Sequence, residues 1–191
     1  FISSEIGNAV SAYGRIEEVL NAVNDIEGGE VDTEIKGKIE FKNVSLTLGE
    51  SPILKNISFT VQPGSRTAVL GPTAAGKTQI FYLITGLQQP TEGEILIDDV
   101  FVNDYKKDTL YKQLGLVFQD SILFNTTIQE NISFRKDVQA DSIQKAIDTS
   151  ELTDFIAEQP EGLNTVLSER GQSISGGQKQ RVAIARALVT N

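Results

Sequence analysis

The chain has 191 residues, with 17 basic and 26 acidic side chains and a formal net charge of −9. This length suits one domain with a real core and a small appended subdomain. The negative charge argues against a nucleic-acid partner, because binding to that backbone is mostly electrostatic. With no cysteine and no histidine, disulfides, thiolate metal sites and histidine acid–base chemistry are excluded.

The first predicted element is a helix over residues 1 to about 27. Glu27-Gly28-Gly29 is expected to end it. Two interpretations stay open, a helix docked on its own domain and a helix that belongs to a larger assembly. Apolar side chains recur in steps of three and four and form one stripe: Ile2, Ile6, Val10, Tyr13, Ile16, Leu20 and Val23.

The chain contains no methionine, so Phe1 is not a natural translation start and the sequence is expected to be a piece of a longer protein. It shows no signal peptide. Its sequence also has no apolar run long enough to span a bilayer. The piece itself is therefore expected to be soluble.

Short alternating or apolar runs, separated by Gly, Pro and Asp turns, predict strands in the next part of the chain. From about residue 125 the pattern becomes helical, with ADSIQKAIDTS and ELTDFIAEQ ahead of a final alanine-rich helix. The predicted fold class is therefore α/β. The predicted strands are KIEFKNVSLTL (38–48), ILKNISFTV (53–61), RTAVLG (66–71) and GEILID (93–98).

The strongest local motif is a full match to the phosphate-loop pattern G-x-x-x-x-G-K-[ST]. Its residues are Gly71, Pro72, Thr73, Ala74, Ala75, Gly76, Lys77 and Thr78. An apolar strand before it and helical spacing after it supply the usual context. The loop N–H groups would hold phosphates, Lys77 would add charge at the β and γ phosphates, and Thr78 would bind Mg²⁺. The alternative is a glycine-rich turn without a ligand.

A second phosphate cradle is predicted at the start of the final helix, where Ser175, Gly176, Gly177 and Gln178 follow Ile174. This stretch closely resembles the signature sequence of ATP-binding cassette (ABC) proteins, with isoleucine in place of the usual leucine. In isolation it would suit a flexible turn before a helix. The resemblance extends from about residue 37: LGLVFQDSILFNTTIQENI (114–132) resembles the glutamine loop, and LNTVLSERG (163–171) resembles the exporter segment before the signature.

On this resemblance the chain is identified as the nucleotide-binding domain of an exporter-type ABC transporter, a fused membrane–ATPase half transporter, cut before the Walker B strand. The implied fold is a P-loop NTPase, incomplete at its C-terminus. Residues 1–29 would be a helix and linker from the end of the transmembrane domain, and residues 37–191 the ABC ATP-binding domain. The implied parts are a RecA-like core (about 66–89 and 110–120), an antiparallel β subdomain (about 37–65 and 90–105) and a helical signature subdomain (about 121–187).

The resemblance also assigns roles to single residues. Gln119 would contact Mg²⁺ and the attacking water, so Gln119 and Lys77 are the catalytic candidates, and Thr78 and Gln119 the metal ligands. Leu48 takes the position at which exporters usually stack an aromatic ring on adenine, which predicts a weakened base site unless an aromatic such as Phe41 reaches the base.

The family pairs two nucleotide-binding domains head to tail, which would explain two cradles in one chain. The implied partners are a second ABC ATPase domain and transmembrane domains, and the implied location is the cytoplasmic face of the cell membrane. The implied cofactors are ATP and Mg²⁺.

The implied function is to couple Mg-ATP binding and hydrolysis to the export of an unknown substrate. The alternatives are a soluble non-transporter ABC ATPase and a nucleotide-binding module without turnover. The family's carboxylate pair and switch histidine would lie beyond Asn191, so the piece alone is expected to be inactive.

Overall fold

The computed structural model describes residues 2–21, 28–134, 138–168, 171 and 173–189. Its first element is the helix α1 (Ile2–Leu20), which ends earlier than predicted. Asn21, a residue type that favours helix ends, forms the closing turn. Gly28 and Gly29 are not helical, and the predicted positions Val23 and Glu27 lie outside the described residues.

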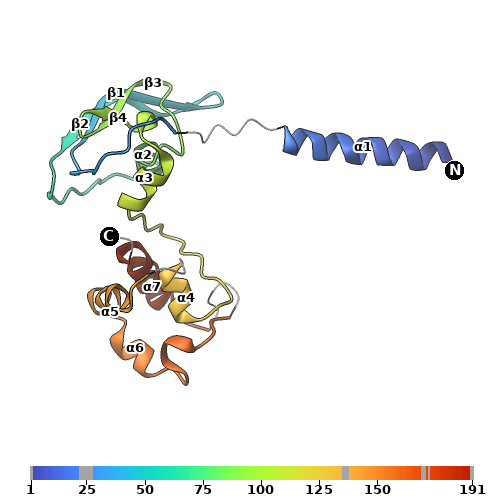
Figure 1. The fold of residues 1–191 in the computed structure, drawn as a ribbon. Helices are drawn as coiled ribbons and strands as arrows, with labels where there is room; N and C mark the ends of the chain where they lie inside the picture. Colours follow the sequence, from blue (N-terminus) through green and yellow to red (C-terminus); the bar gives the residue numbers. More distant parts are fainter. Residues whose placement is uncertain (1, 22–27, 135–137, 169–170, 172, 190–191) are drawn as a thin grey trace.

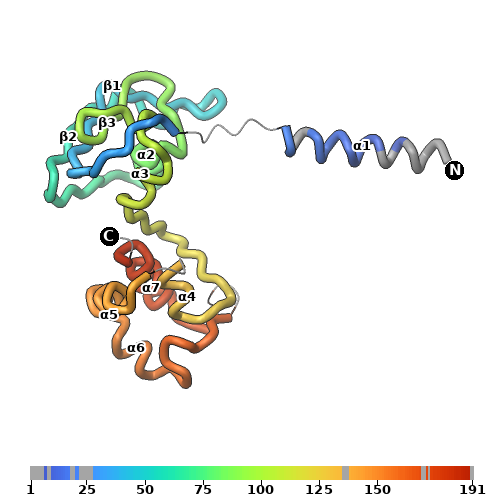
Figure 2. The backbone as a smooth tube through the Cα atoms, in the orientation of Figure 1, coloured from blue at the N-terminus to red at the C-terminus, as the bar shows by residue number. Residues whose placement is uncertain are grey.

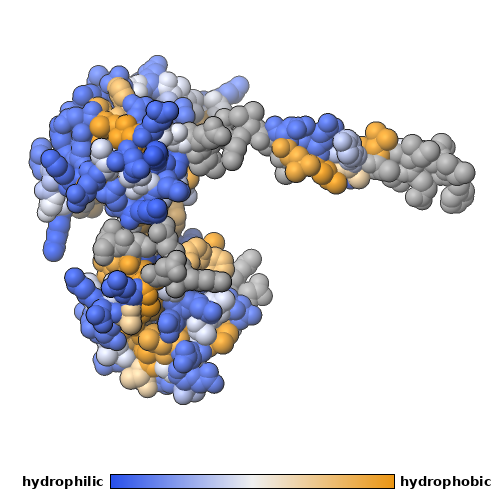
Figure 3. Space-filling model, in the orientation of Figure 1, coloured by the Kyte–Doolittle hydropathy of each residue, from blue (hydrophilic) through white to orange (hydrophobic). Residues whose placement is uncertain are grey.

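Four side chains of the predicted apolar stripe of α1 are exposed. Figure 3 shows apolar surface along one side of this helix. A helix docked on its own domain would bury these side chains, so their exposure favours the other interpretation, a helix that belongs to a larger assembly. The exposed side chains are Val10, Tyr13, Ile16 and Leu20, at 58–77%.

Four strands between residues 39 and 101 form one antiparallel sheet, in the order β2-β1-β3-β4 (Figure 1). A tight turn at Gly49, with φ of 60°, joins the first two strands and pairs Leu48 with Ser51. The strands predicted at 38–48, 53–61 and 93–98 are confirmed. The four strands are β1 (Ile39–Leu48), β2 (Ser51–Val61), β3 (Glu92–Ile97) and β4 (Val100–Phe101).

One face of the sheet is covered by two helices and a 3-10 turn, and together they enclose the first of two cores (Figure 1). Phe41, Val44 and Leu46 of β1 are buried there with Leu83 and Leu110 of the helices. Burying a side chain of this size contributes about 1.5–3 kcal/mol. The covering elements are α2 (Lys77–Ile84), the turn η1 (Val102–Asp104) and α3 (Lys107–Gln113).

The segment from Gly28 to Lys38 lies along this first unit as a strap. Its backbone pairs with the end of η1, where Gly29 donates to Asn103 and Val31 to Asp104. A Cβ atom on Gly29 would lie only 2.2 Å from the carbonyl oxygen of Asp104, so this close approach requires glycine.

At its far end the strap is held by one carboxylate. The side chain of Asp98 accepts hydrogen bonds from the backbone N–H groups of Lys36, Gly37 and Lys38. Burial raises the pKa of Asp98, but these three amides outweigh burial and leave the pKa below its ordinary value of 3.8. The carboxylate therefore fixes the strap while it is charged.

Buried side chains from Leu123 onward form a second hydrophobic core. Figure 2 traces residues 114–124 from α3 to this helical unit. The C-terminal helix contacts two others, and its buried Val182 and Ala185 allow close packing. The helices predicted over ADSIQKAIDTS, ELTDFIAEQ and the alanine-rich end of the chain are confirmed as α5 (Ala140–Thr149), α6 (Thr153–Ala157) and α7 (Gly176–Leu188). The same unit also contains α4 (Ile128–Ser133) and the turn η2 (Gly162–Asn164).

The strand predicted at residues 66–71 is wrong. These residues have no regular secondary structure, and Leu70 is 90% exposed. A strand exists only when a neighbour satisfies its backbone groups, and no strand of the described sheet pairs with this segment. The apolar pattern alone therefore does not form a strand here.

Candidate functional site

The phosphate loop is a tight turn that leads into α2. Gly76, the residue before the helix, has φ of 81°, and Ala74 has φ of 64°. A Cβ on Gly76 would also lie 2.9 Å from side-chain atoms of Ile53 and Leu54 in β2. Glycine is therefore required at position 76 both by its left-handed conformation and by the nearby strand.

Gly71 does not have this requirement, because it is not among the glycines with positive φ. A Cβ there would meet only the Cβ of Ala75, at 3.4 Å. The sequence predicts that Gly71 and Gly76 allow the loop backbone to curl. In the structure, the residues of this loop with a left-handed backbone are instead Ala74 and Gly76.

The side chain of Lys77 folds back over the loop. Its ammonium donates to the carbonyl oxygens of Gly71, at 2.9 Å, and Pro72, at 2.6 Å. The rest of the loop from Gly71 to Ala75, and Thr78, is exposed. A cation beside the open N-terminus of α2 suits a phosphate group. The loop thus fits the phosphates of a nucleotide.

The segment that carries Gln119 lies near the helix of the phosphate loop. The ring of Phe118 contacts the ring of Tyr82 in α2, with centroids 5.7 Å apart. Gln119 itself is exposed, and within the described ranges it has no hydrogen bond to Lys77 or Thr78. The hydroxyl of Thr78 and the amide oxygen of Gln119 are the hard oxygen donors that Mg²⁺ prefers. By their chemistry these two side chains suit a Mg²⁺ ion that is held together with phosphates.

The predicted signature lies at the start of α7, and Ser175 is the capping residue. Its hydroxyl accepts from the backbone N–H of Gln178, at 3.3 Å, and its own N–H donates to the Gln178 side chain, at 2.8 Å. Gly176 and Gly177 are exposed, with nothing within 4 Å of an added Cβ. The helix N-terminus is thus stable and open.

The structure does not bring the two cradles together. The phosphate loop adjoins the first core, whereas Ser175 to Gln178 open a helix of the second core (Figure 1). Each cradle faces solvent in its own unit. The residues predicted to bind nucleotide therefore lie in two separate places within one chain.

Leu48 lies at the end of β1 and is 43% exposed. The alternative base partner, Phe41, is 2% exposed and stacks on Phe59, with ring centroids 4.5 Å apart. Phe41 is thus committed to the core and cannot contact a base. Among these two candidates only Leu48 is accessible.

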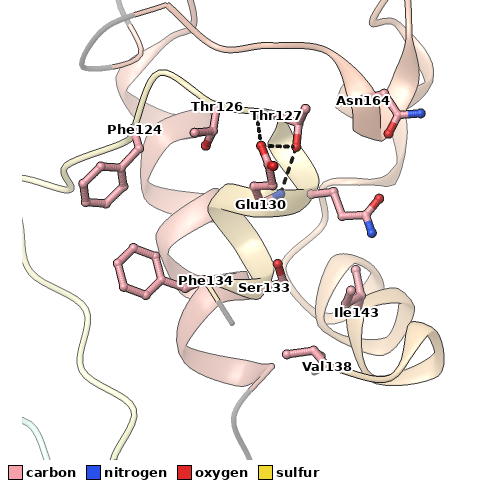
Figure 4. Close-up of a pocket in the computed structure, with 10 residues that line it drawn as sticks. Phe124, Thr126, Thr127, Glu130, Ser133, Phe134, Val138, Ile143 and Asn164 are labelled. Atoms are coloured by element: carbon pink, nitrogen blue, oxygen red, sulfur yellow. Dashed lines mark hydrogen bonds between the residues drawn. The ribbon is translucent and has the colours of Figure 1, made fainter. Parts of the chain in front are cut away.

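A hollow of about 640 Å³ opens beside α4, on the helical unit (Figure 4). At its rim Thr127 and Glu130 form a capping box, and the backbone N–H and hydroxyl of Thr127 lower the pKa of Glu130. On the left of Figure 4 the rings of Phe124 and Phe134 lie side by side. Sequence reasoning missed this place, although the T-x-x-E pattern at 127–130 marks the helix start.

Comparison with known proteins agrees with this geometry. Residues 54–191 match the ABC transporter family. The chain is 44% identical over 154 residues to "Iron-sulfur clusters transporter ATM1, mitochondrial" of Candida glabrata, which covers 80% of the chain and 21% of that protein. It is 41% identical over 163 residues to "ATP-dependent lipid A-core flippase" of Burkholderia orbicola, which covers 84% of the chain and 28% of that protein.

The fold is also similar to a solved structure, that of a bacterial Atm1-family ABC exporter with ATP bound. The TM-score is 0.86 at 35% identity, covering 100% of this chain and 34% of that one. The chain thus spans about a third or less of the relatives it matches. Among the described helices none is long and apolar enough to cross a membrane. With its phosphate-loop motif and a family match over residues 54–191, the chain belongs to the ABC transporter family.

Proposed function

We propose that this chain binds Mg-ATP between its phosphate loop and the signature of a second ABC domain, and so drives export of an unidentified substrate by a longer protein. The observation that carries the proposal is the separation of the two cradles. Lys77 belongs to the unit built on the first core and is half-buried, whereas Ser175 belongs to the unit built on the second core and is exposed. A nucleotide bound at the phosphate loop of one domain would therefore also contact the signature segment of a second domain.

Binding begins at the phosphate loop. Lys77 leaves the carbonyl oxygens of Gly71 and Pro72 and donates to phosphate oxygens, while the loop N–H groups donate to the same phosphates. Thr78 and Gln119 would supply oxygen ligands to Mg²⁺, and Gln119 would also orient the attacking water. The bound metal ion would neutralise charge on the phosphates during transfer.

The second half-site acts on the partner's nucleotide. The hydroxyl of Ser175 and the N–H groups of Gly176 and Gly177 lie at the start of a 13-residue helix, whose dipole favours an anion. Loss of the γ-phosphate removes this contact, so the paired state is favoured only with ATP bound.

The division of the chain follows from the same proposal. Residues 1–29, with the exposed stripe of α1, would extend the last transmembrane helix, and residues 37–191 would form the ATP-binding domain at the cytoplasmic face of the membrane. The partners would be a second ABC ATPase domain and the transmembrane domains. Gln119 is the one water-positioning residue that the resemblance assigns to this sequence, so we expect this chain by itself to show no ATP turnover above background.

The trans arrangement is tested by Ser175→Arg. The variant should keep ATP binding, because the phosphate loop is in the other unit, and should lose the doubling of the 20.8 kDa mass that Mg-ATP is expected to produce. Light scattering measures the mass, and calorimetry measures binding. Gln144→Arg adds the same charge to an exposed position of α5 and serves as control. Association by Ser175→Arg as strong as that of the unchanged chain would overturn the proposal.

A further inference from the structure

Arg186, in the last turn of α7, is a half-buried cation that binds only neutral groups among the described residues. Its guanidinium donates to the carbonyl oxygen of Asn131 at 2.8 Å, to that of Ile122 at 3.0 Å, and to the side-chain oxygen of Asn131 at 3.1 Å. None of the ion pairs between described residues includes Arg186. Burial lowers the pKa of Arg186, yet arginine stays charged in proteins.

Two aromatic rings complete the surroundings of this cation. The guanidinium carbon lies 5.3 Å from the ring centroid of Phe134 and 5.7 Å from that of Phe124. Both distances are within the range of cation–π attraction. Phe134, the C-cap of α4, has a positive φ of 45°, a conformation that is uncommon outside glycine. The arginine thus holds α7 against two separate segments.

Asn131 extends the same network into the loop between Phe124 and Thr127. It is fully buried, and its amide nitrogen donates to the carbonyl oxygens of Phe124, Thr126 and Thr127. Its side-chain oxygen accepts from the N–H of Phe124 at 2.9 Å. The loop is therefore tied to Asn131, and Asn131 is tied to Arg186.

This network joins two elements of the proposed site. The tied segment starts at Ile122, which follows Gln119 after only two intervening residues. At the other end, α7 begins directly after Ser175. A helix rises about 1.5 Å per residue, so Ser175 and Arg186 lie about 16 Å apart along one stiff element.

We infer that Arg186 is a positioning residue for ATP hydrolysis: it links the signature helix to the segment that carries Gln119, so that contact of Ser175 with the partner's nucleotide sets the position of Gln119 in this domain. The inference rests on the proposed function. It differs from a purely structural role, in which Arg186 only stabilises the helical core.

The substitution Arg186→Lys tests the link. Lysine keeps the charge and its attraction to the rings, but one ammonium does not reproduce the planar fork that reaches both Ile122 and Asn131. In the natural full-length chain we expect kcat for ATP to fall about tenfold or more, with KM changed less than about twofold. Arg181→Lys is the matched control, because Arg181 lies on the same helix but pairs with exposed Glu151.

A second measurement separates positioning from stability. Hydrogen exchange of the amides in 119–127 and in 175–180 is compared with and without Mg-ATP. In the unchanged protein, Mg-ATP should slow exchange in both segments. In Arg186→Lys it should slow exchange only in 175–180. Equal slowing of both segments in the variant, or an unchanged kcat, would overturn the inference, as would a rise in KM that accounts for the whole loss.

If Arg186→Lys does not fold, Phe124→Leu decides. It removes one ring, while the backbone groups of Phe124 that bind Asn131 remain. The same selective loss of exchange protection in 119–127 supports the link, and full protection there overturns it. Lys77→Ala distinguishes the two proposals. If this variant binds ATP as well as the unchanged protein, the proposed function fails. If Lys77→Ala loses ATP binding but Arg186→Lys has no effect, only the link through Arg186 is overturned.

Discussion

The ammonium of Lys77 lies 2.6 Å from the carbonyl oxygen of Pro72, within its own loop. Together with the contact to Gly71 at 2.9 Å, this keeps the cation at the place where phosphates are expected. When a phosphate binds, Lys77 exchanges two neutral carbonyl acceptors for charged phosphate oxygens, which bind an ammonium more strongly.

The first prediction concerns this lysine. Lys77→Ala removes a charge-assisted hydrogen bond worth about 1.5–3 kcal/mol, so ATP affinity should fall by at least about tenfold. Titration calorimetry with Mg-ATP measures the loss. Lys55→Ala, which removes an exposed lysine from β2, should have no effect. Equal affinities of Lys77→Ala and the unchanged chain would contradict the phosphate-loop assignment.

The second prediction concerns the base. Leu48 is accessible but cannot stack as an aromatic ring does, so the domain should discriminate poorly between ATP and GTP. Leu48→Tyr should tighten ATP binding by up to about tenfold, equivalent to about 1.4 kcal/mol. Competition of both nucleotides against a fluorescent analogue measures this. Val166→Tyr, at a 60% exposed position on the helical unit, is the control; strong ATP preference in the unchanged chain, with no gain from Leu48→Tyr, would place the base elsewhere.

The third prediction concerns acid stability. The pKa of Asp98 in the folded chain lies below its ordinary value of 3.8, so this carboxylate stabilises the fold above that value. The contribution is lost as the pH falls below 3.8 through the folded pKa.

Asp98→Asn should therefore reduce stability at neutral pH and flatten its decline in acid. Asparagine also tolerates the positive φ of 50° at this position. Thermal unfolding followed between neutral pH and about pH 3 measures both effects. Asp99→Asn, which removes only an exposed partner of Lys38, should keep the steep acid dependence. Parallel curves for Asp98→Asn and the unchanged chain would contradict the assignment.

The phosphate loop and the start of α7 could be predicted because their physical causes are local. Gly76 needs a positive φ at the turn into α2, and Ser175 and Gln178 form a capping box from a four-residue pattern. Each feature depends on neighbours in the sequence. Local patterns therefore predict these elements well.

Long-range features could not be predicted in the same way. Residues 66–71 contain the kind of short apolar run that predicts a strand, but a strand depends on a partner that the pattern does not specify. Arg186 and Asn131 are 55 positions apart, and neither stands in a motif that indicates the other. The structure is needed to find such contacts.

The fourth prediction exploits the two capping boxes. Gln178→Glu keeps the geometry of the box at Ser175, and a carboxylate there should leave stability unchanged or raise it by about 0.3–1 kcal/mol. Association with Mg-ATP should nevertheless be lost, since the new charge repels a phosphate. Light scattering and thermal unfolding test the two effects, and Glu130→Gln on α4 is the reciprocal control. Association retained in Gln178→Glu would show that no phosphate approaches this helix.

The two capping boxes thus differ in one formal charge. At α4 the carboxylate of Glu130 already compensates the positive end of the helix, so that end has little attraction left for an anion. At α7 the neutral amide of Gln178 secures the same backbone groups and leaves the positive potential uncompensated. One atom of difference between Glu and Gln, oxygen in place of nitrogen, therefore separates a helix start that is only structural from one that remains able to attract a phosphate.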